Sequence, residues 1–104
     1  MRQSTVELIA ETVERDDIGQ EYTEAASSGE VYCTVDSVTR EEWRVAYQAG
    51  WDSSAKLTVS AADYGGERVA IFEGKRYEIY RTYQDGMDVE LYLGERVGER
   101  DGTT

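Results

Sequence analysis

The chain has 104 residues, which is enough for one domain with its own core. It contains 22 acidic and 11 basic residues, a formal net charge of −11, and no histidine. Because proteins bind duplex DNA through lysines and arginines that displace counterions, this balance argues against direct nucleic-acid binding. The lack of histidine also removes the commonest general base and every catalytic triad built on it.

The remaining chemistry-bearing residues favour no catalytic site. Cys33 is the one cysteine, so it cannot form an internal disulfide, and its apolar neighbours in a strand indicate a core thiol. Close acidic pairs such as Asp16-Asp17 and Glu41-Glu42 have simpler roles in a turn and at the start of a helix. We therefore expect no enzymatic activity, no bound metal and no cofactor. No targeting segment or membrane-spanning apolar run is present, so we expect a soluble, cytoplasmic protein.

The first third of the chain has the pattern of strands. Residues 4–15 are rich in β-branched side chains and predict a strand, and 16–20 has the aspartates and glycine of a turn. A weaker strand is expected over 21–25. Residues 26–30 have the composition of a loop, and 31–38 alternates apolar and polar residues as a strong strand does.

One helix is predicted within residues 39–51. Thr39 and Glu42 have the spacing of a capping box, in which each side chain accepts a hydrogen bond from the other's free backbone N–H. An apolar stripe follows at helical spacing, formed by Trp43, Ala46 and Tyr47. Gly50 can adopt the left-handed conformation that ends a helix. The helix should therefore have about three turns.

Strands resume after the helix. Residues 55–61 predict one strand, 69–83 predict a hairpin that turns at 74–75, and 89–93 predict the last strand. Short antiparallel strands at this spacing are typical of closed or doubly layered sheets, which leave few exposed edges. The sequence thus predicts a mainly β fold: a small antiparallel β-barrel or sandwich of six to seven strands with one short α-helix inserted.

The predicted domain organisation is simple. Residues 1–98 should form a single domain, and the polar, glycine-bearing residues 99–104 should form a flexible C-terminal tail.

The last two predicted strands have apolar or aromatic side chains on both faces, so something must cover the face that points away from the core. The side chains expected on the core side are Tyr77, Ile79, Tyr83, Val89, Leu91 and Leu93. Tyr80 and Tyr92 then lie on the other face, where tyrosine suits a surface that is sometimes wet and sometimes covered. They are candidates for a contact between subunits, because aromatic residues are enriched at interface centres. The alternative is an ordinary cross-strand pair without function.

Two segments resemble a known family. The sequence "SVTREEW" (37–43) and the hairpin "GKRYEIYRTY" (74–83), in this order and spacing, resemble the head–tail adaptor proteins of tailed bacteriophages and prophages, also called head-closure or stopper proteins. The likeness extends from about Ser4 to Gly98. It rests on ordered spacing, since neither segment is a catalytic signature.

The resemblance implies a function in virion assembly. Such proteins form a homo-oligomeric ring beneath the portal, close the channel after DNA packaging and dock the tail. The implied partners are portal or adaptor proteins and tail-terminator or tail proteins, in the virion and, during assembly, in the host cytoplasm. DNA would pass nearby without specific binding. The residues implied in channel closure and the ring interface are Ser37, Thr39, Arg40, Glu41, Glu42, Trp43, Tyr47 and Trp51.

Another class of function remains open. A small acidic binding module or inhibitor could mimic nucleic acid and occupy a basic surface of one partner. The two hypotheses differ in stoichiometry, because an adaptor forms rings and a mimic stays small. An enzyme is the third choice, and it would need a metal held by carboxylates.

Overall fold

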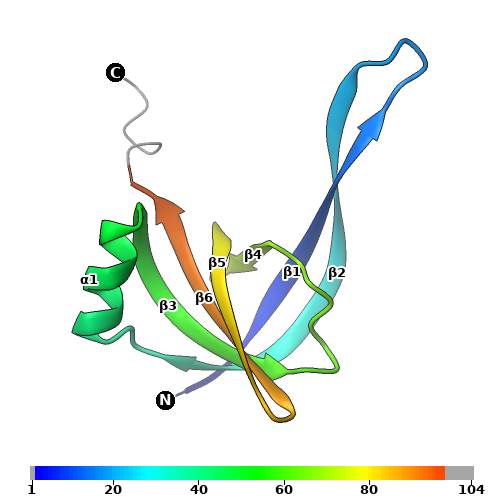
Figure 1. Cartoon of the computed structure of the whole chain (residues 1–104). Helices are drawn as coiled ribbons and strands as arrows, with labels where there is room; N and C mark the ends of the chain where they lie inside the picture. Colours follow the sequence, from blue (N-terminus) through cyan, green and yellow to red (C-terminus); the bar gives the residue numbers. More distant parts are fainter. Residues whose placement is uncertain (1, 98–104) are drawn as a thin grey trace.

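The structure is a computed structural model, and it describes residues 2–97. The strands are β1 Arg2–Arg15, β2 Glu21–Asp36, β3 Trp51–Ser60, β4 Val69–Phe72, β5 Lys75–Asp85 and β6 Asp88–Arg96, and one helix, α1 Arg40–Gln48, lies between β2 and β3 (Figure 1). The predicted tail, 99–104, lies outside the described residues. Among residues 2–97, no helix is long and apolar enough to cross a membrane.

All six strands are antiparallel and belong to one sheet. The neighbours follow the order β1-β2-β3-β6-β5-β4, and the sheet closes because β4 also pairs with β1, through Glu7 to Ile9. Helix α1 packs beside β3, outside the closed sheet (Figure 1). The structure confirms the predicted mainly β fold, with six strands and one short helix within residues 2–97.

The core lies inside the closed sheet. Alternate residues along each strand point inward, so a fully buried cluster forms from several strands. The largest side chains of the cluster with less than 2% of their surface exposed are those of Leu8, Leu57, Leu91, Leu93, Val6 and Val59, and the Phe72 ring packs among them at 4%. Cys33 is buried in the same cluster, as the sequence predicted, and burial raises the pKa of its thiol.

The loop predicted over 26–30 is wrong, because β2 runs through this segment without a break. A register shift between Glu7 and Ile9 marks a β-bulge, with Gly29 in β2 at φ +98°. The Gly29 N–H donates to Ser27 Oγ at 3.0 Å. Glycine and serine therefore bend the strand here and do not end it. A bulged strand and a loop can have the same glycine and serine content, so composition does not distinguish them.

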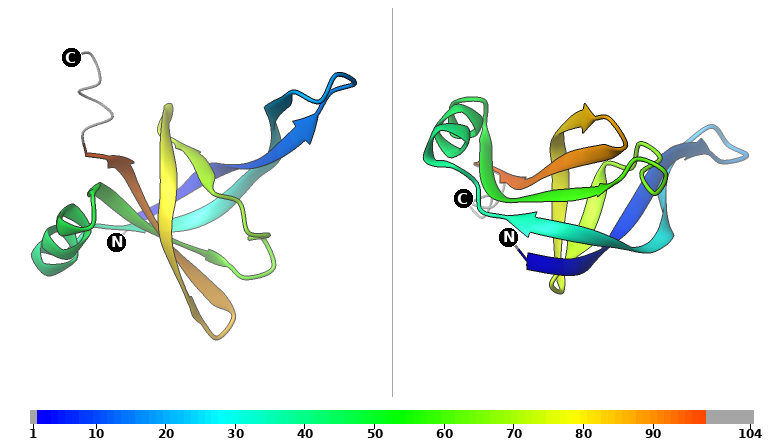
Figure 2. Two further views of the ribbon diagram at one scale, coloured as in Figure 1. Left: turned by 45° about the horizontal axis from the view of Figure 1, so that its top comes forward. Right: turned by 90° about the horizontal axis from the view of Figure 1, so that it is seen from below.

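Beyond this bulge, β1 and β2 leave the body as a two-stranded ribbon. We call residues Ala10–Ser27 the arm: six cross-strand pairs, from Ala10 with Ala26 to Arg15 with Glu21, and the turn at 16–20. Two further views show the arm projecting away from the closed sheet (Figure 2). The predicted turn is confirmed, with Asp16 Oδ1 accepting hydrogen bonds from the N–H groups of Ile18 and Gln20.

A second bulge changes the predicted faces of β5. Tyr77 and Ile79 pack against the core as expected, but a register shift between Ile79 and Arg81 exchanges the faces beyond Tyr80. Tyr83 is consequently 55% exposed, and the prediction that it faces the core is wrong. The prediction is confirmed for β6, where Val89, Leu91 and Leu93 are buried. A bulge adds one residue to one strand, so a strict alternation of two cannot continue past it.

The hairpin turn before β5 is displaced by one residue from its predicted position. It consists of Glu73 and Gly74, with φ values of 53° and 79°. Two successive positive φ angles are what a two-residue turn needs to match the twist of the flanking strands.

The exchange of faces in β5 predicts different losses of unfolding free energy for one substitution in β6 and one in β5. Leu91→Ala should lower the free energy of unfolding by about 3 kcal/mol, since it leaves a cavity in the core. Tyr83→Ala should change it by less than about 1 kcal/mol, because the ring is mostly solvated. Urea denaturation of both variants measures the difference. A larger loss for Tyr83→Ala would mean that β5 has no bulge at Tyr80.

Candidate functional site

The segment with the family resemblance forms the N-terminus of α1 and the chain before it. Thr39 is the N-cap, and its Oγ1 accepts a hydrogen bond from the Glu42 N–H at 3.1 Å, as the capping-box prediction requires. Gly50 follows the helix at φ +97°. Of the predicted apolar stripe, Ala46 is buried, while Trp43 and Tyr47 remain 42% and 43% exposed.

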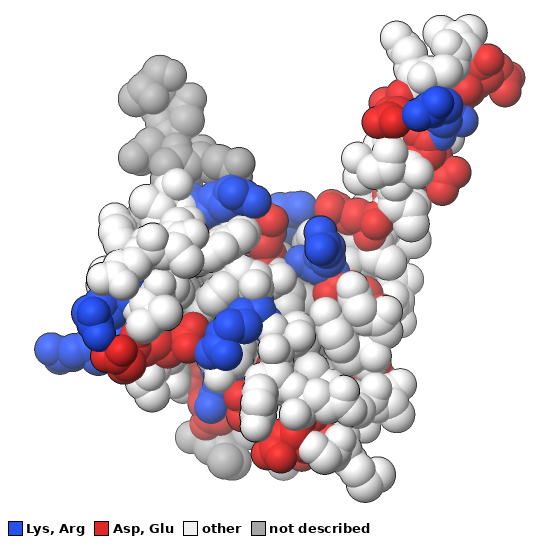
Figure 3. Space-filling model, in the orientation of Figure 1, with Lys and Arg blue, Asp and Glu red and all other residues white. Residues whose placement is uncertain are grey.

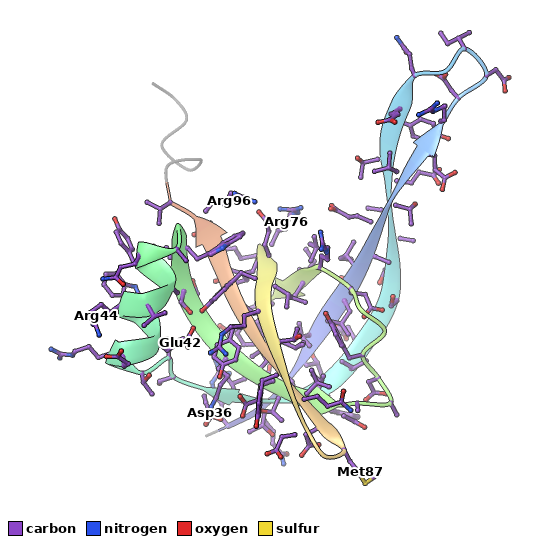
Figure 4. The ribbon with its side chains drawn as sticks, in the orientation of Figure 1. Asp36, Glu42, Arg44, Arg76, Met87 and Arg96 are labelled. Carbon is purple, nitrogen blue, oxygen red and sulfur yellow. The ribbon has the colours of Figure 1, made fainter. Side chains whose placement is uncertain are left out.

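The Glu42 carboxylate departs from its predicted role. It reaches from α1 to β5 rather than back to the N-cap: Oε2 accepts a hydrogen bond from the Tyr80 hydroxyl at 2.8 Å, and Oε1 accepts one from Arg81. The Glu42 side chain is 17% exposed. Figure 4 shows Glu42 on the side of α1 that faces the sheet and Arg44 on the outward side. This carboxylate therefore attaches the helix to the closed sheet.

Tyr80 is the centre of this attachment. Its oxygen also lies 2.7 Å from Ser53 Oγ in β3. A phenol has one proton to donate, so the Tyr80 proton goes to the Glu42 carboxylate and Ser53 donates to the phenol oxygen. Burial, together with the negative charge of Glu42, raises the pKa of Tyr80 from 10 to about 12. One hydroxyl thus joins α1, β3 and β5.

Aromatic rings and a glycine hold Tyr80 in place. The Trp51 ring stacks on it at 5.5 Å between centroids, and the Tyr92 ring is tilted against it at 6.2 Å. The Arg81 guanidinium lies 4.0 Å from the centre of the Tyr92 ring. A Cβ at Gly94 would come within 3.2 Å of the Tyr80 ring and 2.9 Å of the Asp52 carbonyl oxygen. Only glycine allows this close approach.

These contacts answer the question raised by the second face of the last strands. We call Glu42, Ser53, Tyr80, Arg81 and Tyr92 the Glu42 cluster. It covers the outer side of β5 and β6 with the chain's own helix and first residues of β3. Tyr92 is 9% exposed, so most of its surface is already occupied within one chain. A contact of Tyr80 and Tyr92 with another subunit remains a prediction.

The outward surface beside this cluster is aromatic and hollowed. The Trp43 and Tyr47 rings stack at 4.9 Å between centroids, and the Trp43 indole N–H donates to Asp52 Oδ1 at 3.1 Å. An open depression of about 500 Å³ adjoins Trp43. It is lined by Ser37, Val38, Thr39, Arg40, Trp43, Ser53 and Ser54. We call the stacked pair and this depression the α1 surface.

The structure brings together most of the residues predicted from the sequence, in two different settings. Ser37, Thr39, Arg40, Trp43 and Tyr47 belong to the outward α1 surface. Glu42, Trp51, Tyr80 and Tyr92 lie in or against the Glu42 cluster behind it. Glu41 belongs to neither, because its carboxylate pairs with Arg44 in the solvent.

Sequence reasoning missed Ser53, Arg81 and Gly94. Ser53 and Arg81 have no local signal, because their roles depend on bulges that bring β3 and β5 under the helix. Gly94 had a usable signal. A glycine inside a strand often marks a close backbone approach, and here that approach admits the Tyr80 ring.

The hydrogen bonds of the Glu42 cluster join α1 to β3 and β5. Within residues 2–97, no three His, Cys, Asp or Glu side chains are placed to hold a metal ion, and every buried side-chain nitrogen or oxygen has a hydrogen-bond partner. The cluster positions α1, and the α1 surface is what the molecule presents outward. Neither models of known protein families nor curated proteins give a match to this chain.

The two neighbouring glutamates of α1 give a matched pair of variants. Glu42→Ala should lower the free energy of unfolding by about 2 kcal/mol, because it leaves the half-buried Tyr80 hydroxyl and Arg81 without their acceptor. Glu41→Ala removes an exposed ion pair and should cost about 0.5 kcal/mol or less. Denaturation curves for the two variants measure this difference. Equal losses would show that Glu42 does not hold the helix.

The raised pKa of Tyr80 predicts a pH dependence at the alkaline end. Since the folded chain holds this proton more tightly than the unfolded chain, stability should fall as the pH rises from about 10 towards 12. Tyr80→Phe should remove the contribution of the Tyr80 hydroxyl to this pH dependence of stability. Titration of tyrosinate absorbance should show one late-ionising tyrosine fewer in Tyr80→Phe than in the wild type. An unchanged late fraction would contradict the assignment.

Proposed function

We propose that this chain is a structural protein of a tailed phage or prophage that forms a ring at the head–tail junction. In this role the ring closes the portal channel after DNA packaging and docks the tail. It acts by assembly, without turnover and without a cofactor. The observation that carries the proposal is the α1 surface, which joins two exposed, stacked aromatic rings to the segment resembling the family.

The α1 surface has the properties of a protein contact. Trp43 and Tyr47 are large, rigid rings, and such residues supply much of the binding energy at interface centres. Their geometry is fixed in the free chain by stacking and by the Trp43 hydrogen bond to Asp52, so little side-chain entropy remains to be lost on binding. A ring of identical subunits needs this kind of patch to meet a different face of the neighbour.

The Glu42 cluster has a supporting role in this proposal. It holds α1 at a fixed orientation on the closed sheet, and identical orientation in each copy is what a closed ring requires. Tyr80 and Tyr92 then act from behind the contact. The net charge of −11 suits a protein beside a DNA channel, because phosphates find few cations to hold them.

Assembly on phage particles tests the proposal directly. The purified protein is added to DNA-filled, tailless heads, and electron microscopy records bound rings and retained DNA. Rings at the portal together with DNA retention would support the assignment. Heads that bind no protein and lose their DNA would refute it.

A charged substitution on the α1 surface should separate assembly from folding. Tyr47→Glu should abolish ring formation on heads, because it places a carboxylate in an aromatic contact. Tyr83→Glu is the matched control, since Tyr83 is also an exposed aromatic but lies on β5 away from α1. Circular dichroism should show both variants folded. Rings formed by Tyr47→Glu would contradict the contact.

The second candidate is a small acidic binding module that occupies a basic site on one partner. The observation in its favour is the concentration of carboxylates on the arm, which exposes six acidic residues and one basic residue. Such a module would bind its partner one to one and form no ring. Mass measurement of the complex distinguishes the two functions.

A further inference from the structure

The arm is a long element that its own chain leaves uncovered. Its residues are exposed except for Ala10, which is partly exposed. Its two outer edges are also unpaired: β4 pairs with β1 only through Glu7–Ile9, and β3 pairs with β2 only through Thr34–Asp36. A two-stranded ribbon of this kind is only marginally stable in water. Unpaired edges are a ready site for an added strand.

The arm also exposes apolar side chains towards its tip. Val13 is 67% exposed, Ile18 is 79% exposed and Tyr22 is 46% exposed. This exposure agrees with the course of the arm, which leads away from the closed sheet in both views (Figure 2). The register pairs Val13 with Thr23 and Tyr22 with Glu14, so Val13 and Tyr22 lie on opposite faces of the ribbon. A partner that holds the edge can bury an apolar side chain on each face.

The charge of the arm limits what can bind there. Six acidic residues and one basic residue give it a net charge of −5 in 18 residues, and Figure 3 shows the carboxylates distributed along it. The acidic residues are Glu11, Glu14, Asp16, Asp17, Glu21 and Glu24. Nucleic acid and anionic membranes are repelled by such a surface.

A second copy of the chain is a poor occupant for the same reason. The body, residues 2–9 and 28–97, has 14 acidic and 9 basic residues, so it too has a net charge of −5. Most of those cations already pair with carboxylates of their own chain. Pairing two arms edge to edge would bring like charges together and would be unfavourable.

We propose that the arm docks on a basic surface of a different protein, adding its edge to that protein while Val13, Ile18 and Tyr22 become buried. Carboxylates on both faces of the ribbon then contact lysine or arginine side chains of the partner. This attraction steers the encounter and fixes the register in which the two strands pair. The proposal names the element by which the chain would bind a basic partner, as the second candidate function requires, and the ring described above does not use this element. It does not depend on ring formation.

The base of the arm is built to hold it in one direction. Arg76 of β5 pairs with Glu11 at 3.2 Å, and the Ser28 hydroxyl donates to Glu67 Oε2 at 2.8 Å, which ties β2 to the segment between β3 and β4. The bulge at Gly29 sets the angle at which the ribbon leaves the sheet. A fixed direction reduces the entropy that a docking element loses on binding.

A defined probe tests the proposal with the full chain. The probe is a synthetic peptide of alternating lysine and valine, which offers a basic, extended strand. Amide chemical shifts and hydrogen exchange of the isotope-labelled protein are recorded while the peptide is added. Shifts and new protection confined to residues 10–27 are expected. Changes spread evenly over the body would overturn the proposal.

Two triple variants separate docking on the arm from general attraction. The arm variant combines Glu14→Gln, Asp17→Asn and Glu24→Gln. It should bind the peptide about tenfold more weakly, which is the loss expected from three favourable charge contacts. The matched control neutralises three exposed carboxylates of the body, by Asp63→Asn, Asp85→Asn and Asp88→Asn. It changes the net charge equally and should leave affinity within about twofold. Equal losses in both variants would overturn the proposal.

A third variant tests the apolar part and the identity of the occupant. This variant combines Val13→Ser, Ile18→Ser and Tyr22→Ser and keeps the charge of the arm. At high salt, where apolar contacts dominate, it should bind the peptide more weakly than the wild type does. Unchanged affinity at high salt would show that charge alone attracts the peptide and would refute burial. Sedimentation of the wild type should show no self-association through the arm. Dimers that disappear in this variant would identify a second copy as the occupant and also refute the proposal.

Discussion

The pairing of β4 with β1 closes the sheet, and the rest of the molecule depends on it. This contact involves three residues of β1, Glu7 to Ile9, and a β4 of four residues. With the sheet closed, side chains from six strands share one interior, and a chain of this length can bury its leucines and valines completely. Closure also removes most edges of the sheet, which leaves the arm as the long unpaired part.

Closure over so few residues requires the strands to bend, and the arm and the Glu42 cluster arise at the bends. The bulge at Gly29 releases the arm from the body. The irregularities after Ser53 in β3 and after Ile79 in β5 bring Ser53 and Tyr80 together beneath Glu42. Bulges re-aim side chains at defined positions. The arm and the Glu42 cluster are therefore consequences of one constraint on the sheet.

The molecule separates its two outward surfaces. The α1 surface is aromatic, shallow and held rigidly by hydrogen bonds from behind, whereas the arm is acidic, extended and attached at its base. The first suits contacts between identical subunits, which need repeatable geometry. The second suits a partner of opposite charge, which can be attracted at a distance. The proposed assembly role uses the first, and the proposed docking to a basic partner uses the second.

The class of fold, the N-cap at Thr39, the burial of Cys33 and the inward face of β6 follow from the sequence alone. These features depend on local propensity and on alternation within a strand, and both can be read from neighbouring residues. The alternation predicted a wrong face for Tyr83, because a bulge in β5 shifts the register. Composition predicted a loop over 26–30, because a bulged strand has the glycine and serine that a loop also has. The contact of Glu42 with Tyr80 and Arg81, which are 38 and 39 residues away in the chain, becomes apparent only in the folded molecule. Such contacts depend on how a closed sheet bends, and no local pattern contains that information.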